Sequence, residues 1–169
     1  MLFRSILHPY PGVTSVRPLA TPLAFAMLCS PGVGAVVNAQ SSVDNVSVDY
    51  ILPGTKTHWN ELALGAGTAQ REAAAGRFHS DALAAPESWW RGLQDAVGFV
   101  GIIAGGRETS LDSIGQFAAK ISAECGAPVD YVVGPRDVHD QPLVDFMLGR
   151  PAGDVTLKMA QWLGERFND

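Results

Sequence analysis

The second half of the chain alternates between apolar runs and amphipathic stretches. Residues 99–104 form an apolar run typical of a strand buried on both faces, and residues 129–133 form a second, shorter one. Between them, apolar residues recur at helical spacing and predict one buried helix face, made of Ile114, Phe117, Ala118 and Ile121. Strand, helix and strand joined by short loops predict parallel strands with a right-handed crossover, and therefore an α/β fold.

The ends of two helices can also be placed. Ser110 can cap the first of them, Asp112 is favourable in its first turn, and Gly126 suits the left-handed stop position after it. A last helix is predicted to begin near Asp154. Its buried positions are predicted to be Val155, Met159, Trp162, Leu163 and Phe167.

The first half gives weaker signals. Residues 23–29 predict a buried strand, which the prolines and glycines after it would stop, and an apolar segment at 2–7 precedes a proline-punctuated loop. Residues 38–60 are rich in Ser, Asn and Asp and predict a loop, whereas 59–66 and 67–76 carry Ala-rich helical signals. The pair Trp89 and Trp90 is expected to pack against the core or to line a pocket wall.

Composition narrows the class of protein. A chain of 169 residues with a net charge of -5 and no Lys/Arg cluster predicts one domain and argues against nucleic-acid binding. No apolar run is long enough to span a membrane, so we expect a cytoplasmic protein. The N-terminus loosely imitates a signal peptide, which leaves secretion as the alternative. Cys29 and Cys125 are expected to be core thiols. The glycines at 32–34 and 105–106 lack the spacing of a dinucleotide or phosphate loop, so no cofactor or metal is expected.

Two titratable residues follow the predicted strands and are the candidates for chemistry. Glu108 comes after the glycine turn that ends the first strand, and His139 lies in the polar loop that follows the second. A carboxylate that orients an imidazole and stabilises its charged form is the supporting half of a hydrolytic triad. Alternatively, both are solvated surface residues, and Asp112 is a rival for the acid. His8, His58 and His79 lack metal-ligand spacing and are expected to be structural or exposed.

These residues resemble a known family. The run from Gly105 to Asp112 resembles the acid motif of α/β-hydrolases of the hormone-sensitive-lipase-like group, and is closest to fungal esterases similar to steryl acetyl hydrolases. Glu108 falls on the acid position of that motif, and the segment 138–140 looks like the family's His loop. Segments 85–93, 8–11 and 28–31 look like other parts of the family pattern, so the resemblance covers nearly the whole chain.

The chain also departs from the family pattern. The family has a Gly-x-Ser-x-Gly nucleophile elbow and an upstream oxyanion motif, and neither occurs in this sequence. Gly32 stands where a Trp is usual, and Ser113 replaces a second acidic residue. The resemblance therefore implies a single partial α/β-hydrolase domain over 1–169, the C-terminal part of the fold, with a mostly parallel sheet flanked by helices. Residues 40–95 would be a loop or cap-like helical region, and 96–169 would hold the acid strand, helix, His loop and last helix.

Two functions are compatible with this pattern. By resemblance, the chain is a carboxylic-ester hydrolase with Glu108 and His139 as catalytic residues, acting on a small-molecule natural-product ester but inactive alone because the serine is absent. The alternative is a non-catalytic remnant that binds a small molecule or a protein. In both cases an interior strand of the parent sheet would become an edge, so we expect marginal stability and self-association through it.

Overall fold

The computed structural model describes residues 19–34, 39–64, 71, 74–76, 78 and 81–167. The predicted apolar segment at 2–7, the signal-peptide-like stretch up to residue 18 and most of the predicted helix at 67–76 lie outside these residues. In the described part of the chain, no helix is long and apolar enough to cross a membrane.

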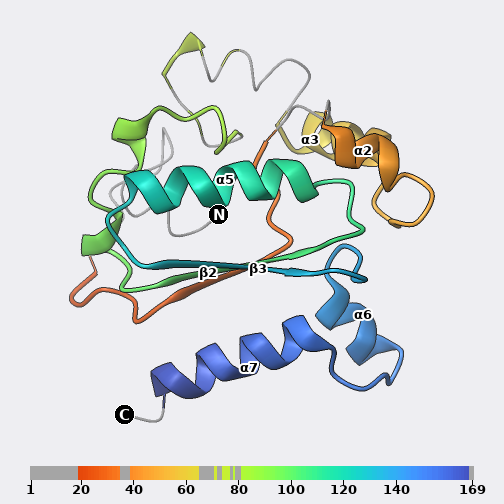
Figure 1. Cartoon of the computed structure of the whole chain (residues 1–169). Helices are drawn as coiled ribbons and strands as arrows, with labels where there is room; N and C mark the ends of the chain where they lie inside the picture. Colours follow the sequence, from red (N-terminus) through yellow and green to blue (C-terminus); the bar gives the residue numbers. More distant parts are fainter. Residues whose placement is uncertain are drawn as a thin grey trace.

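Three parallel strands form the sheet, in the order β1-β2-β3 (Figure 1). They are β1 (Ala26–Cys29), β2 (Val100–Gly105) and β3 (Val129–Gly134), so the predicted parallel α/β arrangement is confirmed. The predicted strand at 23–29 is shorter than expected and only half-buried, because its first residues make a single bridge at Leu23. Among the described strands, β1 pairs with β2 alone and so lies at the edge of the sheet.

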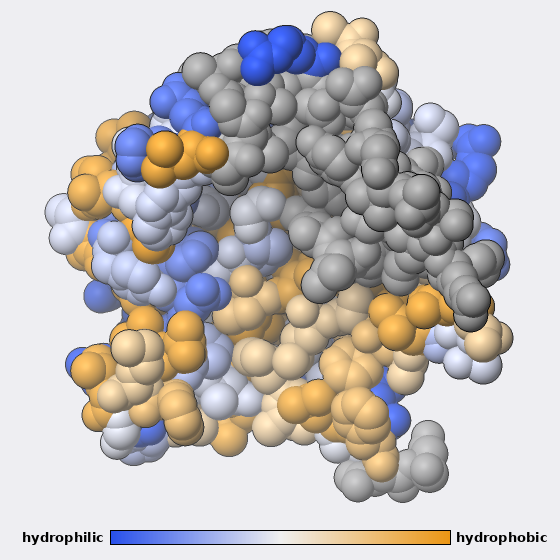
Figure 2. Space-filling view, turned by 180° about the vertical axis from the view of Figure 1, so that it is seen from behind, coloured by the Kyte–Doolittle hydropathy of each residue, from blue (hydrophilic) through white to orange (hydrophobic). Residues whose placement is uncertain are grey.

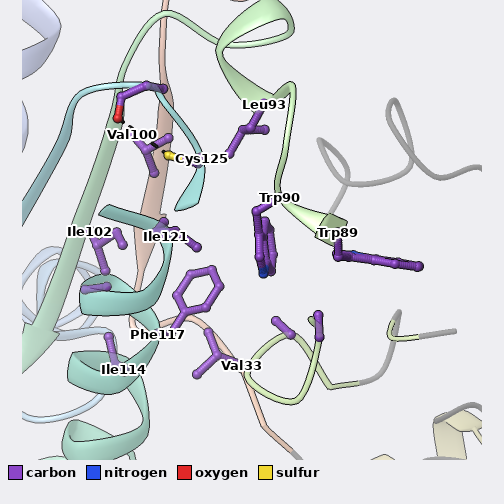
Figure 3. Close-up of a cluster of buried hydrophobic side chains, with 14 of the residues drawn as sticks. Val33, Trp89, Trp90, Leu93, Val100, Ile102, Ile114, Phe117, Ile121 and Cys125 are labelled. Atoms are coloured by element: carbon purple, nitrogen blue, oxygen red, sulfur yellow. Dashed lines mark hydrogen bonds between the residues drawn. The ribbon is translucent and has the colours of Figure 1, made fainter. Parts of the chain in front are cut away.

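Helices cover both faces of the central strand β2, which explains why every residue of that strand is buried. Helix α5 (Leu111–Glu124) lies on one face and α7 (Asp154–Phe167) on the other (Figure 1). The four positions predicted to form the buried face of α5 are all buried. Phe117 of this helix meets Trp90 edge to face at 5.4 Å, in the larger core cluster (Figure 3). The predicted packing of the two tryptophans into the core is confirmed.

The face under α7 depends on one large side chain. Trp162 is 1% exposed and lies against Gly101 of β2, where a Cβ atom would approach its ring to 2.7 Å. The predicted start of this helix at Asp154 and the burial of Val155 are confirmed. The predicted burial of Phe167 is wrong: this last residue of the helix is 69% exposed, and its ring makes only an edge-to-face contact with Phe25, next to β1.

Several local predictions need correction. Residues 38–60 are not a plain loop, because α2 (Gln40–Asp44) and most of α3 (Pro53–Leu64) lie in them. Ser110 is the N-cap residue of α5 but makes no side-chain capping hydrogen bond. The left-handed stop after that helix is confirmed at Gly126, with φ +71°.

Other short elements complete the described chain. Two 3-10 helices, η1 (Glu87–Trp89) and η2 (Leu93–Asp95), precede the central strand, and α6 (Gln141–Met147), which no periodicity predicted, follows the His loop. Both cysteines are free thiols, and Cys125 is fully buried while Cys29 is half-buried.

Candidate active site

The turn that follows β2 directs a carboxylate inward rather than into solvent. The side chain of Glu108 is completely buried, and its Oε1 accepts a hydrogen bond of 2.8 Å from the backbone N–H of Gly105 at the end of β2. The backbone N–H of Glu108 in turn donates to the carbonyl of Gly105 at 3.2 Å. The strand end and the carboxylate are therefore fixed to each other within one four-residue turn.

The loop that follows β3 packs directly on this acid turn. The N–H of Gly106 donates to the carbonyl of Gly134 at 2.7 Å, and the N–H of Arg107 donates to the carbonyl of Asp137 at 2.9 Å. A Cβ atom on Gly105 would lie 2.5 Å from two carbonyl oxygens of the His loop, those of Asp137 and Val138. Glycine is thus required where the two loops touch, and the backbones of the loops set the distance between their side chains.

The two predicted residues meet at this junction. Nδ1 of His139 lies 2.9 Å from Oε2 of Glu108, a charge-assisted distance, although the residues are 31 positions apart. The other carboxylate oxygen accepts from Gly105 and from the hydroxyl of Ser30 at 3.3 Å. The rival acid, Asp112, is not the partner of the imidazole. Its carboxylate instead accepts a hydrogen bond of 2.8 Å from the backbone N–H of Ser41.

A second carboxylate stands on the other side of the imidazole. Oδ2 of Asp140 lies 3.6 Å from Nε2 of His139, and the backbone of Asp140 has the positive φ of 48°. Burial by itself would lower the pKa of His139, but the hydrogen bond to Glu108 and the charges of Asp140, Glu108 and Asp49 outweigh it and raise this pKa. The imidazole is therefore held toward its protonated form.

This arrangement predicts the effect of Asp140→Asn. We expect the pKa of His139 to fall in this variant while its bond to Glu108 remains, as measured by NMR titration of the imidazole. A histidine whose pKa is higher in the folded than in the unfolded protein stabilises the fold fully at any pH below its unfolded-state pKa. This contribution is lost as the pH rises through the folded-state pKa. Wild-type stability to urea should therefore fall on going from about pH 6 to above the raised pKa of His139. The fall should be smaller in Asp140→Asn than in the control Asp95→Asn, whose carboxylate lies on an exposed residue.

Two nucleophilic side chains lie close to the pair, but neither is bonded to the base. Ser30 donates its hydroxyl to Glu108 at 3.3 Å and accepts the N–H of Asp140 at 3.0 Å, so both of these hydrogen bonds are to groups other than the imidazole. Burial and the charge of Asp140 raise the pKa of the Cys29 thiol to about 12, which disfavours the reactive thiolate. Among the described residues, no hydroxyl or thiol hydrogen-bonds to Nε2 of His139.

Sequence reasoning missed a polar network that surrounds the acid turn. The segment from α2 to α3 wraps the turn at 108–112, and its members are Ser41, Ser42, Asn45, Asp49 and Lys56. The signal was present as the Ser, Asn and Asp content of 38–60, but such composition is equally typical of a solvated loop. Within the described residues, no group of three or more His, Cys, Asp or Glu side chains is arranged to hold a metal ion.

Solved esterase structures share this architecture. The chain matches an esterase from Pseudomonas putida ECU1011 (18% identity, TM-score 0.60) over 82% of its own length and 39% of that chain. A double mutant of the esterase rPPE matches with 19% identity and a TM-score of 0.64, and an rPPE mutant complexed with (S)-Ac-CPA with 21% and 0.63; each match covers 82% of this chain and 40% of the other. The chain has part of an α/β-hydrolase fold.

The α/β-hydrolase match is one of fold. The chain spans about two fifths of the length of these esterases, at identities that establish architecture alone. No protein-family model matches the sequence, and no curated protein matches it. The predicted fold class is therefore confirmed, whereas the fungal steryl-acetyl-hydrolase-like relationship and the catalytic roles of Glu108 and His139 stay predictions.

Proposed function

We propose that this chain supplies the acid and the base of a serine-type carboxylic-ester hydrolase. The observation that carries the proposal is the fully buried carboxylate of Glu108, 2.9 Å from Nδ1 of His139, after the ends of adjacent parallel strands. In such a pair the carboxylate fixes the tautomer of the ring and stabilises the imidazolium that forms when Nε2 takes the proton of a serine hydroxyl. The base then returns this proton to the leaving alcohol.

The substrate class proposed is a small apolar ester. Helix α6 begins two residues after the base and exposes three large apolar side chains, Leu143, Phe146 and Met147. Figure 2 shows apolar side chains gathered over the lower part of the molecule. The finer assignment, to fungal esterases similar to steryl acetyl hydrolases with a natural-product substrate, is supported by the run from Gly105 to Asp112. In this proposal, residues 40–95 are the cap-like part of a single partial domain.

A non-catalytic role is the second candidate, and one observation favours it. Asp140 lies 3.6 Å from the nitrogen that a serine hydroxyl would need, and its charge favours the protonated ring, which cannot accept a proton. The sequence has no Gly-x-Ser-x-Gly elbow. We therefore expect the 169-residue chain alone to hydrolyse p-nitrophenyl acetate no faster than its His139→Ala variant.

The deciding experiment asks whether the gene also encodes a nucleophile elbow. The transcript is sequenced upstream of the Met1 codon, and the complete product is purified with its His139→Ala and Glu108→Gln variants and an Asp95→Asn control. The proposal expects an in-frame Gly-x-Ser-x-Gly and ester hydrolysis that falls by at least about 10³-fold in His139→Ala and is unchanged in the control. A reading frame that begins at Met1, or ester hydrolysis that survives His139→Ala, would overturn the proposal and favour the non-catalytic role.

A further inference from the structure

We propose that Asp49 is a positioning residue of the Glu108–His139 pair, an inference that rests on the function proposed above. Asp49 is only 5% exposed, yet it lies in the segment between α2 and α3, 59 positions before the acid and 90 before the histidine. Its carboxylate contacts the backbones of both loops that carry the pair, and it contacts neither reacting side chain through a hydrogen bond.

One oxygen of Asp49 holds the acid turn. Oδ2 accepts the backbone N–H of Thr109 at 2.7 Å and the hydroxyl of the same residue at 3.0 Å. Thr109 directly follows Glu108 and is 1% exposed, so its polar groups need protein partners. The conformation of the peptide after Glu108 is therefore fixed from outside the turn.

The other oxygen reaches the His loop. Oδ1 lies 3.4 Å from the backbone N–H of His139, which donates to it, and 3.4 Å from the donating N–H of Ile51. These bonds are long, but the carboxylate charge strengthens them in a buried setting. One side chain thus joins the backbone beside the acid to the backbone of the base, two segments that come from different strands.

The surroundings of Asp49 support this role. The amine of Lys56 donates to the hydroxyl of Thr109 at 2.6 Å, and its positive charge faces the carboxylates of Asp49 and Glu108. The ring of Tyr50 meets the ring of His139 edge to face, with centroids 6.0 Å apart. Figure 1 shows α2 and α3 beside the end of α5 at which that helix begins, next to the acid turn. The segment around Asp49 therefore packs against both the acid turn and His139.

Replacing the carboxylate by an amide separates the two contacts. A carboxylate offers acceptors on both oxygens, whereas an amide offers one oxygen and one NH₂ group, which only donates. The amide oxygen of Asp49→Asn can therefore accept from Thr109 or from the N–H of His139, but not from both. Its NH₂ group then faces the remaining backbone N–H, and the two donors repel each other. Asp49→Ala removes both contacts. Asp81→Asn is the matched control, because Asp81 also accepts a backbone N–H, that of Ala84 at 3.0 Å, outside the site.

The experiment is NMR on the full ¹⁵N-labelled chain. Wild type and Asp81→Asn should show a low-field Nδ1 proton from the imidazole bonded to Glu108, assigned by its absence in His139→Ala. We expect Asp49→Asn and Asp49→Ala to lose this resonance, and the pKa of His139 to fall, at temperatures where their backbone spectra remain folded. A folded Asp49→Asn that keeps the resonance would overturn the proposal, even if its Tm and the pKa of His139 are lower, because loss of the Asp49 charge lowers that pKa without any change of position.

A variant that does not fold at any temperature is replaced by Thr109→Val. This variant deletes the hydroxyl that donates to Oδ2 of Asp49 while keeping the backbone N–H bond, and it should weaken the resonance relative to wild type and Asp81→Asn. A folded Thr109→Val chain whose resonance equals that of wild type would overturn the proposal. The NMR readout needs no ester turnover, so it separates the two ideas: loss of the resonance without any esterase activity in the complete gene product retains the positioning role and rejects the proposed function.

Discussion

Gly105→Ala is expected to unfold the junction between the acid turn and the His loop. The added methyl group would lie 2.5 Å from the carbonyl oxygens of Asp137 and Val138, and both are backbone atoms that no rotamer change can move. The same residue donates its N–H to Glu108 at 2.8 Å, so a shift of Gly105 moves the acid as well. We expect a loss of about 3 kcal/mol or more in the free energy of unfolding, at the upper end of overpacking effects.

Urea unfolding and the Nδ1 proton of His139 measure the two consequences of this substitution. Gly115→Ala is the control: it adds the same methyl group inside α5, where the nearest atom is the hydroxyl of Tyr131 at an ordinary contact distance of 3.5 Å. Because alanine favours helix over glycine, Gly115→Ala should be neutral or stabilising by about 0.5–1 kcal/mol. A Gly105→Ala chain as stable as Gly115→Ala would mean that the two loops do not touch as described.

The parts of the fold that the sequence predicts are those with a strong local period. The four apolar positions of α5 and the start of α7 at Asp154 follow from 3.6-residue spacing, and β2 follows from an apolar run too short for a buried helix. Each of these patterns arises within a single element, because a helix buries one apolar stripe and a central strand buries both of its faces. Phe167 is the exception, because the period identifies a face of the helix but not how much of that face the rest of the chain covers, and this last residue of α7 is 69% exposed.

The candidate site is only half visible in the sequence. Glu108 and His139 can be found because each follows a predicted strand, and parallel strands bring their carboxyl ends together. Asp49 cannot be found this way, because its partners are backbone N–H groups 60 and 90 positions away, and any sequence supplies such groups. Lys56 is hidden similarly, as its partner is the hydroxyl of Thr109. A short polar residue in a polar stretch carries no signal of the loop it will bind.

Asp140 illustrates a different limit. Because Asp140 follows His139 in the sequence, a charge near the imidazole can be expected. Which ring nitrogen the carboxylate faces, however, depends on the left-handed backbone of Asp140 at φ 48° and on the hydrogen bond from its N–H to Ser30. Few residues adopt that conformation, and sequence does not reveal it for an aspartate. The consequence is functional, since the same carboxylate that raises the pKa of the base also opposes its use as a base.

Glu108→Ala is the second substitution with a large expected effect, of about 3 kcal/mol in the free energy of unfolding. The carboxylate is fully buried and accepts three donors: the N–H of Gly105, the hydroxyl of Ser30 and Nδ1 of His139. Alanine leaves these groups without an acceptor and leaves a cavity beside the sheet. The histidine lessens the loss, because it can release its proton and remain neutral, so the effect falls below that of breaking a buried pair of fixed charges.

Glu108→Gln separates the charge of the acid from its hydrogen bonds. The amide has nearly the same volume and one acceptor oxygen, so it can keep the bond from Gly105 while its NH₂ group faces Nδ1 of His139. That ring can then accept only as the opposite tautomer, with the proton on Nε2, where a general base needs a free lone pair. We therefore expect Glu108→Gln to retain most of the stability lost in Glu108→Ala, yet to lower the pKa of His139 and remove its low-field proton. Equal stability of all three chains would show that the carboxylate is solvated rather than buried, and the geometry of the acid turn would then need revision.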